Sequence, residues 1–365
     1  MMPAERIEAT VGVTGMNATD NPAPGVPVAR CLRHEPAFAG KIIGLGYDAL
    51  DPGFYADGLL DGGAILPYPS AGRETLRERL QWARDQLGID VLIPTLDSEL
   101  RALVALAPEL EAMGIRTFLP TLESLERAGK VQLPRLAEDG VISIPPSEAI
   151  MGAEAIPRLT EKFGHTLVVK GVYYGATVTY TQPDAVAAFH KFSAQWGLPV
   201  IVQKFVRGEE FNVAAVGDGR GNMVGAVAMR KMMITDKGKG WCGVAIENPE
   251  LLQLTEALIG ELRWRGPLEV EILKDSQTGT PYVIEINPRF PAWIYLSAGA
   301  GLNLPYYVLR MALGLPLPSI MPNYRAGTLF VRISVDQISD LSTFEQLSAL
   351  GCLRHGEKPC MSSWL

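Results

Sequence analysis

The chain has 365 residues, of which 47% are hydrophobic and 20% charged, and its formal net charge is −7 at pH 7. This is ordinary globular composition, and a chain of this length has room for two or three subdomains. An acidic chain without a Lys/Arg-rich run is not expected to bind nucleic acid. Apolar runs of about 18 residues are missing, which argues against a membrane span. The N-terminus lacks the apolar core of a secretory signal, so the cytoplasm is the expected location.

Cysteine and histidine usage limits the metal chemistry. The four histidines show neither HxxxH nor HExxH spacing, which argues against a zinc site. No CxxC pair occurs, and we expect free thiols at all four cysteines, which are Cys31, Cys242, Cys352 and Cys360. Any bound metal should therefore have oxygen ligands.

Short apolar runs and amphipathic stretches alternate over the first third of the chain. This pattern predicts strands at 10–15, 41–45 and 91–94 and helices at 75–87 and 100–113. Such alternation is typical of an open, doubly wound parallel sheet that binds ligands at the carboxyl ends of its strands. The turn at 12–17 lacks the third glycine of a dinucleotide fingerprint, and prolines follow at 22, 24 and 27, so we interpret it as a tight turn without NAD.

A strand-rich pattern begins near residue 122. Helices are predicted at 123–136 and 153–163, with an extended segment at 141–146 between them. Strands are predicted at 167–170, 199–205, 210–216, 223–230, 268–274 and 282–287. Near the C-terminus a strand is expected at 327–335 and a short helix at 343–350. The order indicates an α+β region behind the α/β domain.

Two of these strands contain acidic residues at alternate positions. Glu269 and Glu271 share one face of the first strand, and Glu285 and Asn287 share one face of the second. If the two faces coincide, their oxygens converge in the kind of cage that Mg²⁺ prefers when it also binds phosphate. The alternative is a solvated sheet face, and spacing alone leaves both interpretations open.

The segment 281–290, PYVIEINPRF, resembles the metal-binding signature of ATP-grasp enzymes, particularly the branch of carbamoyl-phosphate synthetase and biotin carboxylase. The resemblance implies that Glu285 and Asn287 hold Mg²⁺ and that Glu271 occupies the other metal-ligand position. It also implies that Arg289 supports the transferred phosphoryl group. Glu269 falls where a further polar group of the active site is usual.

Basic residues upstream follow the order of the same family. Lys170, at the end of the strand 167–170, resembles the lysine that contacts the nucleotide phosphates, and Lys130 occupies the place of an earlier phosphate-binding residue. The loop 172–177 differs from the family pattern because it contains Tyr173 and Tyr174 where small residues usually cover the phosphates. Whether this loop closes over ATP is left open.

The segment 202–213 resembles the hinge that binds the adenine base. The resemblance places Gln203, Lys204, Phe205 and Val206 along the base and Glu210 at the ribose hydroxyls. The basic segment 230–241 resembles a loop that lies over the triphosphate. Arg230 or Lys231 would there neutralise charge during transfer, and we select Arg230 as the catalytic residue together with Lys170 and Arg289. A solvated hairpin tip is the alternative for this segment.

The expected organisation follows from the motifs and the resemblance. Residues 1–120 would form the N-terminal domain that precedes ATP-grasp modules, and 121–195 and 196–320 the small and large subdomains of a two-subdomain ATP-grasp fold. Residues 321–365 would complete the large subdomain. Trp241 and the aromatic residues of 290–295 either line an acceptor pocket or pack in the core.

The implied activity is that of an ATP-dependent ligase. It would activate a carboxylate as an acyl-phosphate and join it to an amine or a thiol, with ATP and Mg²⁺ as cofactors and Mn²⁺ as a substitute for Mg²⁺. An amino acid or a peptide is the expected substrate, and a homodimer is the default assembly. Two alternatives stay open: an enzyme that forms carbamoyl- or carboxy-phosphate, and a nucleotide-binding regulator without turnover.

Overall fold

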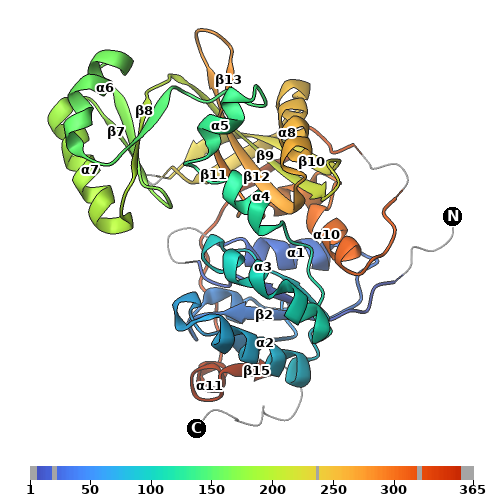
Figure 1. The fold of residues 1–365 in the computed structure, drawn as a ribbon. Helices are drawn as coiled ribbons and strands as arrows, with labels where there is room; N and C mark the ends of the chain where they lie inside the picture. Colours follow the sequence, from blue (N-terminus) through green and yellow to red (C-terminus); the bar gives the residue numbers. More distant parts are fainter. Residues whose placement is uncertain (1–5, 19–22, 236–237, 319–322, 355–365) are drawn as a thin grey trace.

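Three sheets define the architecture of the protein (Figure 1). The computed structural model describes residues 6–18, 23–235, 238–318 and 323–354. A five-stranded sheet lies at the bottom of Figure 1, a six-stranded sheet above it and a four-stranded sheet at the upper left. The mixed α/β and α+β class predicted from the sequence is confirmed.

The N-terminal sheet is doubly wound. Its parallel strands are ordered β3-β2-β1-β4, and alternate residues of each strand enter two separate cores. Val13 packs with helix α1 on one face, whereas Leu45 packs with helices α2 and α3 on the other. The elements are β1 (Val11–Thr14), α1 (Gly25–His34), β2 (Ile42–Gly46), β3 (Gly62–Ile65), α2 (Arg73–Leu87), β4 (Val91–Ile93) and α3 (Asp97–Ala112).

A helix does follow β1, but it begins only after Pro24. Helix α1 begins at Gly25, and Pro27 falls in its first turn, where a missing amide hydrogen is tolerated. A Cβ atom at Gly25 would lie 2.0 Å from the carbonyl oxygen of Thr14, so only glycine lets this helix approach the end of β1 so closely.

The four-stranded sheet has two helices on its outer face. Its strand order is β5-β8-β6-β7, and α6 and α7 supply the helical half of its core (Figure 1). The expected helix 123–136 is instead two short helices, because Gly129 and Pro134 interrupt it. These two helices, α4 (Leu122–Arg127) and α5 (Leu133–Glu138), pack in the core of the six-stranded sheet. The elements of the four-stranded sheet and its helices are β5 (Ser147–Ile150), α6 (Ile156–Phe163), β6 (Leu167–Lys170), β7 (Ala176–Thr179), α7 (Gln182–Trp196) and β8 (Val200–Lys204).

The six-stranded sheet is antiparallel and holds the longest strands. Its order is β13-β12-β9-β10-β11-β14, and helix α8 packs on one face through a core that includes Leu258, Trp264 and Val270. The elements are β9 (Gly208–Asp218), β10 (Met223–Ile234), β11 (Gly240–Ala245), α8 (Pro249–Leu262), β12 (Arg265–Asp275), β13 (Pro281–Asn287), α9 (Tyr295–Gly299), α10 (Leu304–Ala312) and β14 (Leu329–Val331).

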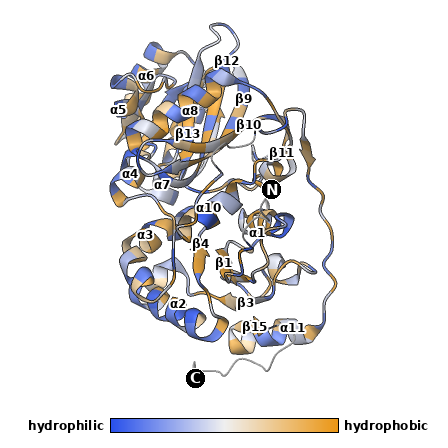
Figure 2. Ribbon diagram, turned by 90° about the vertical axis from the view of Figure 1, so that its right-hand side faces the viewer, coloured by the Kyte–Doolittle hydropathy of each residue, from blue (hydrophilic) through white to orange (hydrophobic). Residues whose placement is uncertain are grey.

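The C-terminal segment is divided between two sheets, which corrects its expected assignment to the large subdomain alone. Strand β14 pairs with β11 of the six-stranded sheet. Residues 332–340 then run extended down the side of the molecule (Figure 2), through α11 (Leu341–Glu345) and a π-helical turn (Gln346–Leu350). Strand β15 (Cys352–Arg354) finally pairs with β3, because the edge of the N-terminal sheet has free backbone groups to satisfy.

Two other expectations concern cysteines and membranes. Cys31 and Cys242 are free thiols, but Cys352 is disulfide-bonded, so the expectation of free thiols is wrong for Cys352. Cys360 lies outside the described residues. Among the helices of the described part of the chain, none has the length and apolarity to cross a bilayer.

Arg79 of α2 joins the C-terminal segment to the N-terminal sheet and provides a test of this topology. Its buried guanidinium donates to the carbonyl oxygens of Ile65 and Gly351. Arg79→Ala removes a charged donor from both carbonyl oxygens and leaves that of Gly351 with only the backbone amide of Ile65, so it should lower the free energy of unfolding by about 2 to 4 kcal/mol in urea titrations. Arg77→Ala, which removes the surface pair with Glu74 on the same helix, should cost less than about 1 kcal/mol. Equal losses would contradict the structural role of Arg79.

Candidate functional site

The antiparallel register of β12 and β13 brings the acidic residues onto one face. Glu269 lies opposite Asn287, and Glu271 lies opposite Glu285. Directly opposite residues of an antiparallel pair project to the same side of the sheet. The two strand faces therefore coincide, as a metal site at these residues requires. We call these four side chains the carboxylate cluster.

Glu269 is the buried centre of the cluster. Its Oε1 accepts hydrogen bonds from Asn212 Nδ2 at 2.6 Å and Trp293 Nε1 at 2.8 Å, and its Oε2 accepts from Asn287 Nδ2 at 3.1 Å. Burial raises the pKa of Glu269 and the charge of Glu271 adds to the shift, while Arg289 acts against it. With its oxygens already bound by protein groups, Glu269 orients its neighbours.

Lys231 reaches the cluster, and Arg230 does not. Nζ of Lys231 lies 2.7 Å from Glu210 Oε2 and 3.5 Å from Glu271 Oε2, and its side chain is only 9% exposed. Burial acts against the charge of Lys231, but Glu271 and Glu210 outweigh it and raise the pKa. Successive residues of a strand face opposite sides, so Arg230 points away and pairs with Glu209 at the surface.

Two further lysines approach the cluster, Lys130 from the turn between α4 and α5 and Lys170 from the end of β6. Nζ of Lys130 lies 3.1 Å from Glu285 Oε1 and also donates to the carbonyl oxygen of Tyr173 at 2.8 Å. Lys170 donates to the carbonyl oxygen of Ile284 at 3.5 Å, where a register shift interrupts the β12–β13 ladder. Burial lowers the pKa of Lys170 to about 8, with Glu285 acting against the shift.

Arg289 connects the cluster to the N-terminal domain. Its Nε donates to Asp97 Oδ2 at 3.0 Å, and its Nη1 lies 3.6 Å from Glu269 Oε2. Asp97 is the first residue of α3, just after β4, and the sequence analysis missed it. Its position at the carboxyl end of a parallel strand was the available signal.

Glu99 fixes the start of the helix that presents Asp97. This buried carboxylate accepts from the backbone amides of Thr95 and Leu96, both at 3.1 Å, and from the hydroxyls of Thr14 and Tyr47. Acidic side chains are favourable at a helix N-terminus, where backbone amides lack partners. The first turn of α3, and with it Asp97, is therefore held in one position.

The loop with the two tyrosines lies beside the cluster. Tyr173 and Tyr174 both contact the ring of Trp196, with ring centroids 6.3 and 5.4 Å away. Burial and the charge of Asp97 raise the pKa of Tyr174 to about 12. Since Lys130 also binds the backbone of Tyr173, the loop is tied to the carboxylate cluster through Glu285.

The expected adenine hinge lies at the end of β8, between the two subdomains. Gln203 is buried in the four-stranded sheet, whereas Lys204 and Phe205 are exposed. The amide of Lys204 binds the carbonyl oxygen of Pro146, but the amide of Val206 has no hydrogen-bond partner within the described ranges. Glu210, expected at the ribose, is bound to Lys231.

A cavity of about 1270 Å³ adjoins the cluster on the side of the N-terminal domain. Trp293, which donates a hydrogen bond to Glu269 of the cluster, lines this cavity together with Trp241 and Tyr295. Phe290 and Ile294 are instead buried in the core. Some of the aromatic residues therefore line a cavity, as one interpretation of the sequence expected, and the others pack in the core, as the alternative expected.

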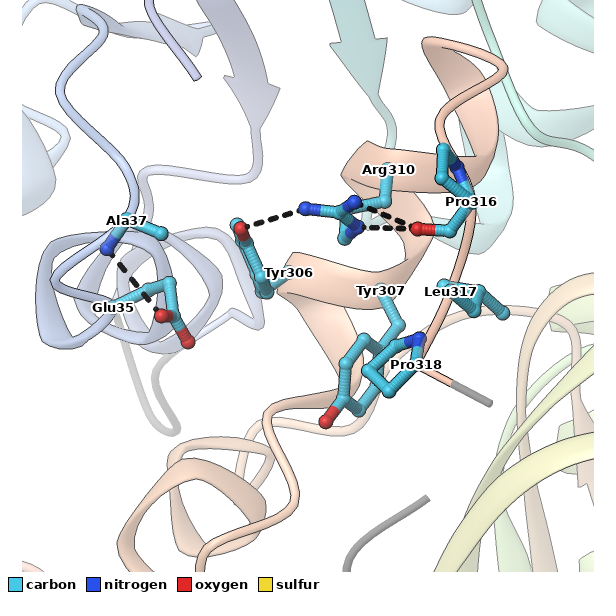
Figure 3. A pocket seen from close by; sticks show the side chains of 8 residues that line it. All are labelled: Glu35, Ala37, Tyr306, Tyr307, Arg310, Pro316, Leu317 and Pro318. Atoms are coloured by element: carbon cyan, nitrogen blue, oxygen red, sulfur yellow. Dashed lines mark hydrogen bonds between the residues drawn. The ribbon is translucent and has the colours of Figure 1, made fainter. Parts of the chain in front are cut away.

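A second cavity, of about 390 Å³, lies between Glu35 and helix α10 (Figure 3). No member of the carboxylate cluster lines it. Arg310, which lines it, donates to the hydroxyl of Tyr306 and to the carbonyl oxygen of Pro316. These contacts engage its guanidinium within the protein.

This combination of fold and cluster defines a class: the chain has the ATP-grasp fold in the form found in biotin carboxylase. The match to the biotin carboxylase domain of Hydrogenobacter thermophilus 2-oxoglutarate carboxylase has a TM-score of 0.68 at 15% identity and covers 89% of this chain and 74% of that one. Campylobacter jejuni biotin carboxylase also gives 0.68, at 17% identity over 86% and 72%. N5-carboxyaminoimidazole synthetase from Staphylococcus aureus gives 0.62, at 15% identity over 87% and 81%.

Within that fold, residues 198–334 match the family described as "ATP-grasp in the biosynthetic pathway with Ter operon". The matched range contains the entire carboxylate cluster, Lys231 and Arg289. The resemblance inferred from the signature 281–290 is therefore confirmed.

The buried charge of Lys170 should cost stability in the absence of ligands. Its pKa falls from 10.5 to about 8 on folding, so the cost is complete below pH 8 and disappears as the pH rises to 10.5. Lys170→Met should raise the free energy of unfolding by about 1 to 3 kcal/mol at pH 7, and the gain should shrink toward pH 10. Lys162→Met, at an exposed lysine, is the matched control for denaturant titrations. If the gain in the free energy of unfolding did not change with pH, the buried charge of Lys170 would not be its cause.

Proposed function

We propose that the protein is an ATP-dependent ligase that activates a carboxylate as an acyl-phosphate and joins it to an amine or a thiol. The observation that supports this most directly is the set of cations around the carboxylate cluster: Lys130 pairs with Glu285, Lys231 with Glu271 and Arg289 with Glu269. Lys170 adds a fourth cation beside Glu285. Phosphoryl transfer depends mainly on positioned charges, which this arrangement supplies.

The residues of the cluster fit Mg²⁺. No group of three or more His, Cys, Asp or Glu side chains suited to a metal occurs within the described ranges. Mg²⁺, however, commonly binds one or two carboxylates and completes its shell with water and phosphate oxygens. Glu271 and Glu285 supply the carboxylates, and Asn287 supplies an amide oxygen once its side chain rotates, since Nδ2 now donates to Glu269 and Glu271. The bound ion would polarise the phosphate oxygens.

Binding of MgATP would exchange partners within the cluster. Lys130 and Lys231 now neutralise Glu285 and Glu271. Mg²⁺ would replace the lysines at the carboxylates, and the phosphates would take the lysines as their cations. The lysines and the carboxylates would thus each have a partner of opposite charge both in the free protein and in the MgATP complex. ATP would therefore enter a site whose charged groups are already in position. The base would lie along Gln203 to Val206, where the Val206 amide is available.

The reaction then follows with balanced bonds. A carboxylate oxygen of the substrate attacks the γ-phosphorus, the bond to the β-phosphate oxygen breaks, and ADP leaves. The amine or thiol attacks the acyl carbon, the carbon–oxygen bond to phosphate breaks, and the nucleophile loses a proton to solvent. Arg289, held by Asp97, would stabilise the charge on the transferred group.

The proposal is tested by supplying MgATP with pools of carboxylates and amines and measuring ADP, AMP and phosphate. Release of ADP that requires both substrates supports the ligase. ADP release with bicarbonate as the carboxylate would identify the carboxy-phosphate alternative, which the two biotin carboxylase structures and their fold make the second candidate. AMP would exclude an acyl-phosphate, and no turnover with any pool would favour a regulator.

Glu285→Gln should reduce ADP release by about 100-fold or more, because it removes a charged ligand of the metal without changing shape. Glu209→Gln is the matched control, since Glu209 faces solvent on a neighbouring strand. Unchanged thermal unfolding of both variants would show that the fold is retained. Full activity of Glu285→Gln would remove this residue from the metal site.

The neighbours Lys231 and Arg230 offer a second comparison. Lys231→Ala should lower turnover by about 100-fold or more, because a buried cation beside the phosphates is lost. Arg230→Ala should change it by less than about 3-fold, because surface ion pairs contribute little. The reverse order in steady-state assays would restore Arg230 as the catalytic residue.

A further inference from the structure

Several segments of the chain line the large cavity, among them residues between 52 and 59 and Trp241. Helix α1 of the N-terminal domain contributes Arg30 and His34, the segment after the cluster contributes Trp293 and Tyr295, and the extended chain from β14 contributes residues 328–335 and 337. This last wall runs down the side of the molecule in Figure 2. Segments that are distant along the chain therefore line one cavity, and Trp293 connects it to the carboxylate cluster.

One end of the cavity adjoins the carboxylate cluster. Trp293 lines the cavity and donates to Glu269. Arg332 also lines it, and its backbone amide binds the carbonyl oxygen of Trp241 at 3.0 Å. Burial lowers the pKa of Arg332, and the charge of Glu269 acts against that shift. A substrate carboxylate in this end of the cavity would lie beside the groups that transfer phosphate.

The cavity also has a cationic group on helix α1. The guanidinium carbon of Arg30 lies 4.1 Å above the ring of Tyr295, whose hydroxyl is 3.3 Å from Nδ1 of His34. Arg33, its neighbour on the helix, is already paired with Asp61. Arg30 has no carboxylate partner within the described ranges, and stacking on Tyr295 leaves the edge of its guanidinium free to donate.

The walls between these cations are largely apolar. Tyr295, Phe330 and Trp241 line the cavity together with Val331 and Ile333, which are 62% and 80% exposed. Apolar side chains beside a cavity favour a ligand with an apolar body, while a few charged groups fix its orientation. At about 1270 Å³, the cavity is larger than a free amino acid requires.

We propose that this cavity binds the acceptor substrate as a dianion: a carboxylate at the end lined by Arg332 and Trp293, an apolar or aromatic body, and a second anionic group bound by Arg30. The assignment of the first carboxylate rests on the proposed ligase function, whereas the anion site at Arg30 does not. The substrate class is thereby narrowed to molecules with two negative groups separated by an apolar spacer. Arg30 is the residue that sets this preference.

The test compares two probes by calorimetric titration of the full chain without MgATP. The dianion 1,4-phenylenediacetate and the monoanion 4-methylphenylacetate share the aromatic spacer and differ in one carboxylate. The dianion should bind about 10-fold more tightly, because one charge-assisted hydrogen bond is gained. Arg30→Gln should remove this advantage and leave the affinity for the monoanion unchanged. Arg158→Gln, at an exposed arginine paired with Glu148, should preserve it.

Several outcomes would overturn the proposal: equal affinity for both probes, no binding of either, or an Arg30→Gln variant that weakens both equally. If Arg332→Gln abolished the tighter binding of the dianion and Arg30→Gln did not, the second anionic group would bind at Arg332, and the role of Arg30 would be rejected. The titration contains no nucleotide, so its result for the anion site at Arg30 remains valid even if the ligase assay shows no turnover. Thermal unfolding of Arg30→Gln should match the parent, since Arg30 is exposed.

Discussion

The pairing of β12 with β13 is the constraint on which the rest of the structure depends. A shift of one residue would turn Glu285 and Asn287 to the opposite face from Glu269 and Glu271 and separate the cluster. The observed register instead concentrates negative charge on one buried face, and buried charge requires compensation. Lys130, Lys231 and Arg289 provide it from three different segments. The cluster therefore organises the surrounding subdomains as well as the chemistry.

The ion pair between Arg289 and Asp97 joins the N-terminal domain to this cluster. Asp97 begins a helix whose first turn is fixed by Glu99, and Arg289 also reaches Glu269. The N-terminal sheet thus has two roles. Asp97, at the end of one strand, orients Arg289, and helix α1 contributes Arg30 to the lining of the large cavity. Asp97 lies at the carboxyl edge of the parallel sheet, where helix N-termini and loops meet.

The proposed nucleotide and acceptor sites lie on different sides of the cluster. Lys170 and the loop with Tyr173 approach from the four-stranded sheet and Lys130 from the turn between α4 and α5. The cavity instead lies toward the N-terminal domain and the chain after β14. The two sites meet at Glu269, which contacts Arg289 and the cavity residue Trp293. The proposed ligase reaction needs two separate sites, because ATP and the substrate carboxylate that receives its phosphoryl group must approach each other from different directions.

The sequence by itself determined the fold class, the strand pair of the cluster and the alternation that places Glu285 with Asn287, because period and spacing are local properties. It left undecided whether two strand faces coincide, since register is set by pairing along the whole sheet. Only the tertiary structure selected Lys231 over Arg230, recruited Asp97 across 192 residues to Arg289, and sent the C-terminal strand back to β3. Such contacts join segments distant along the chain, and no local pattern records which of them meet.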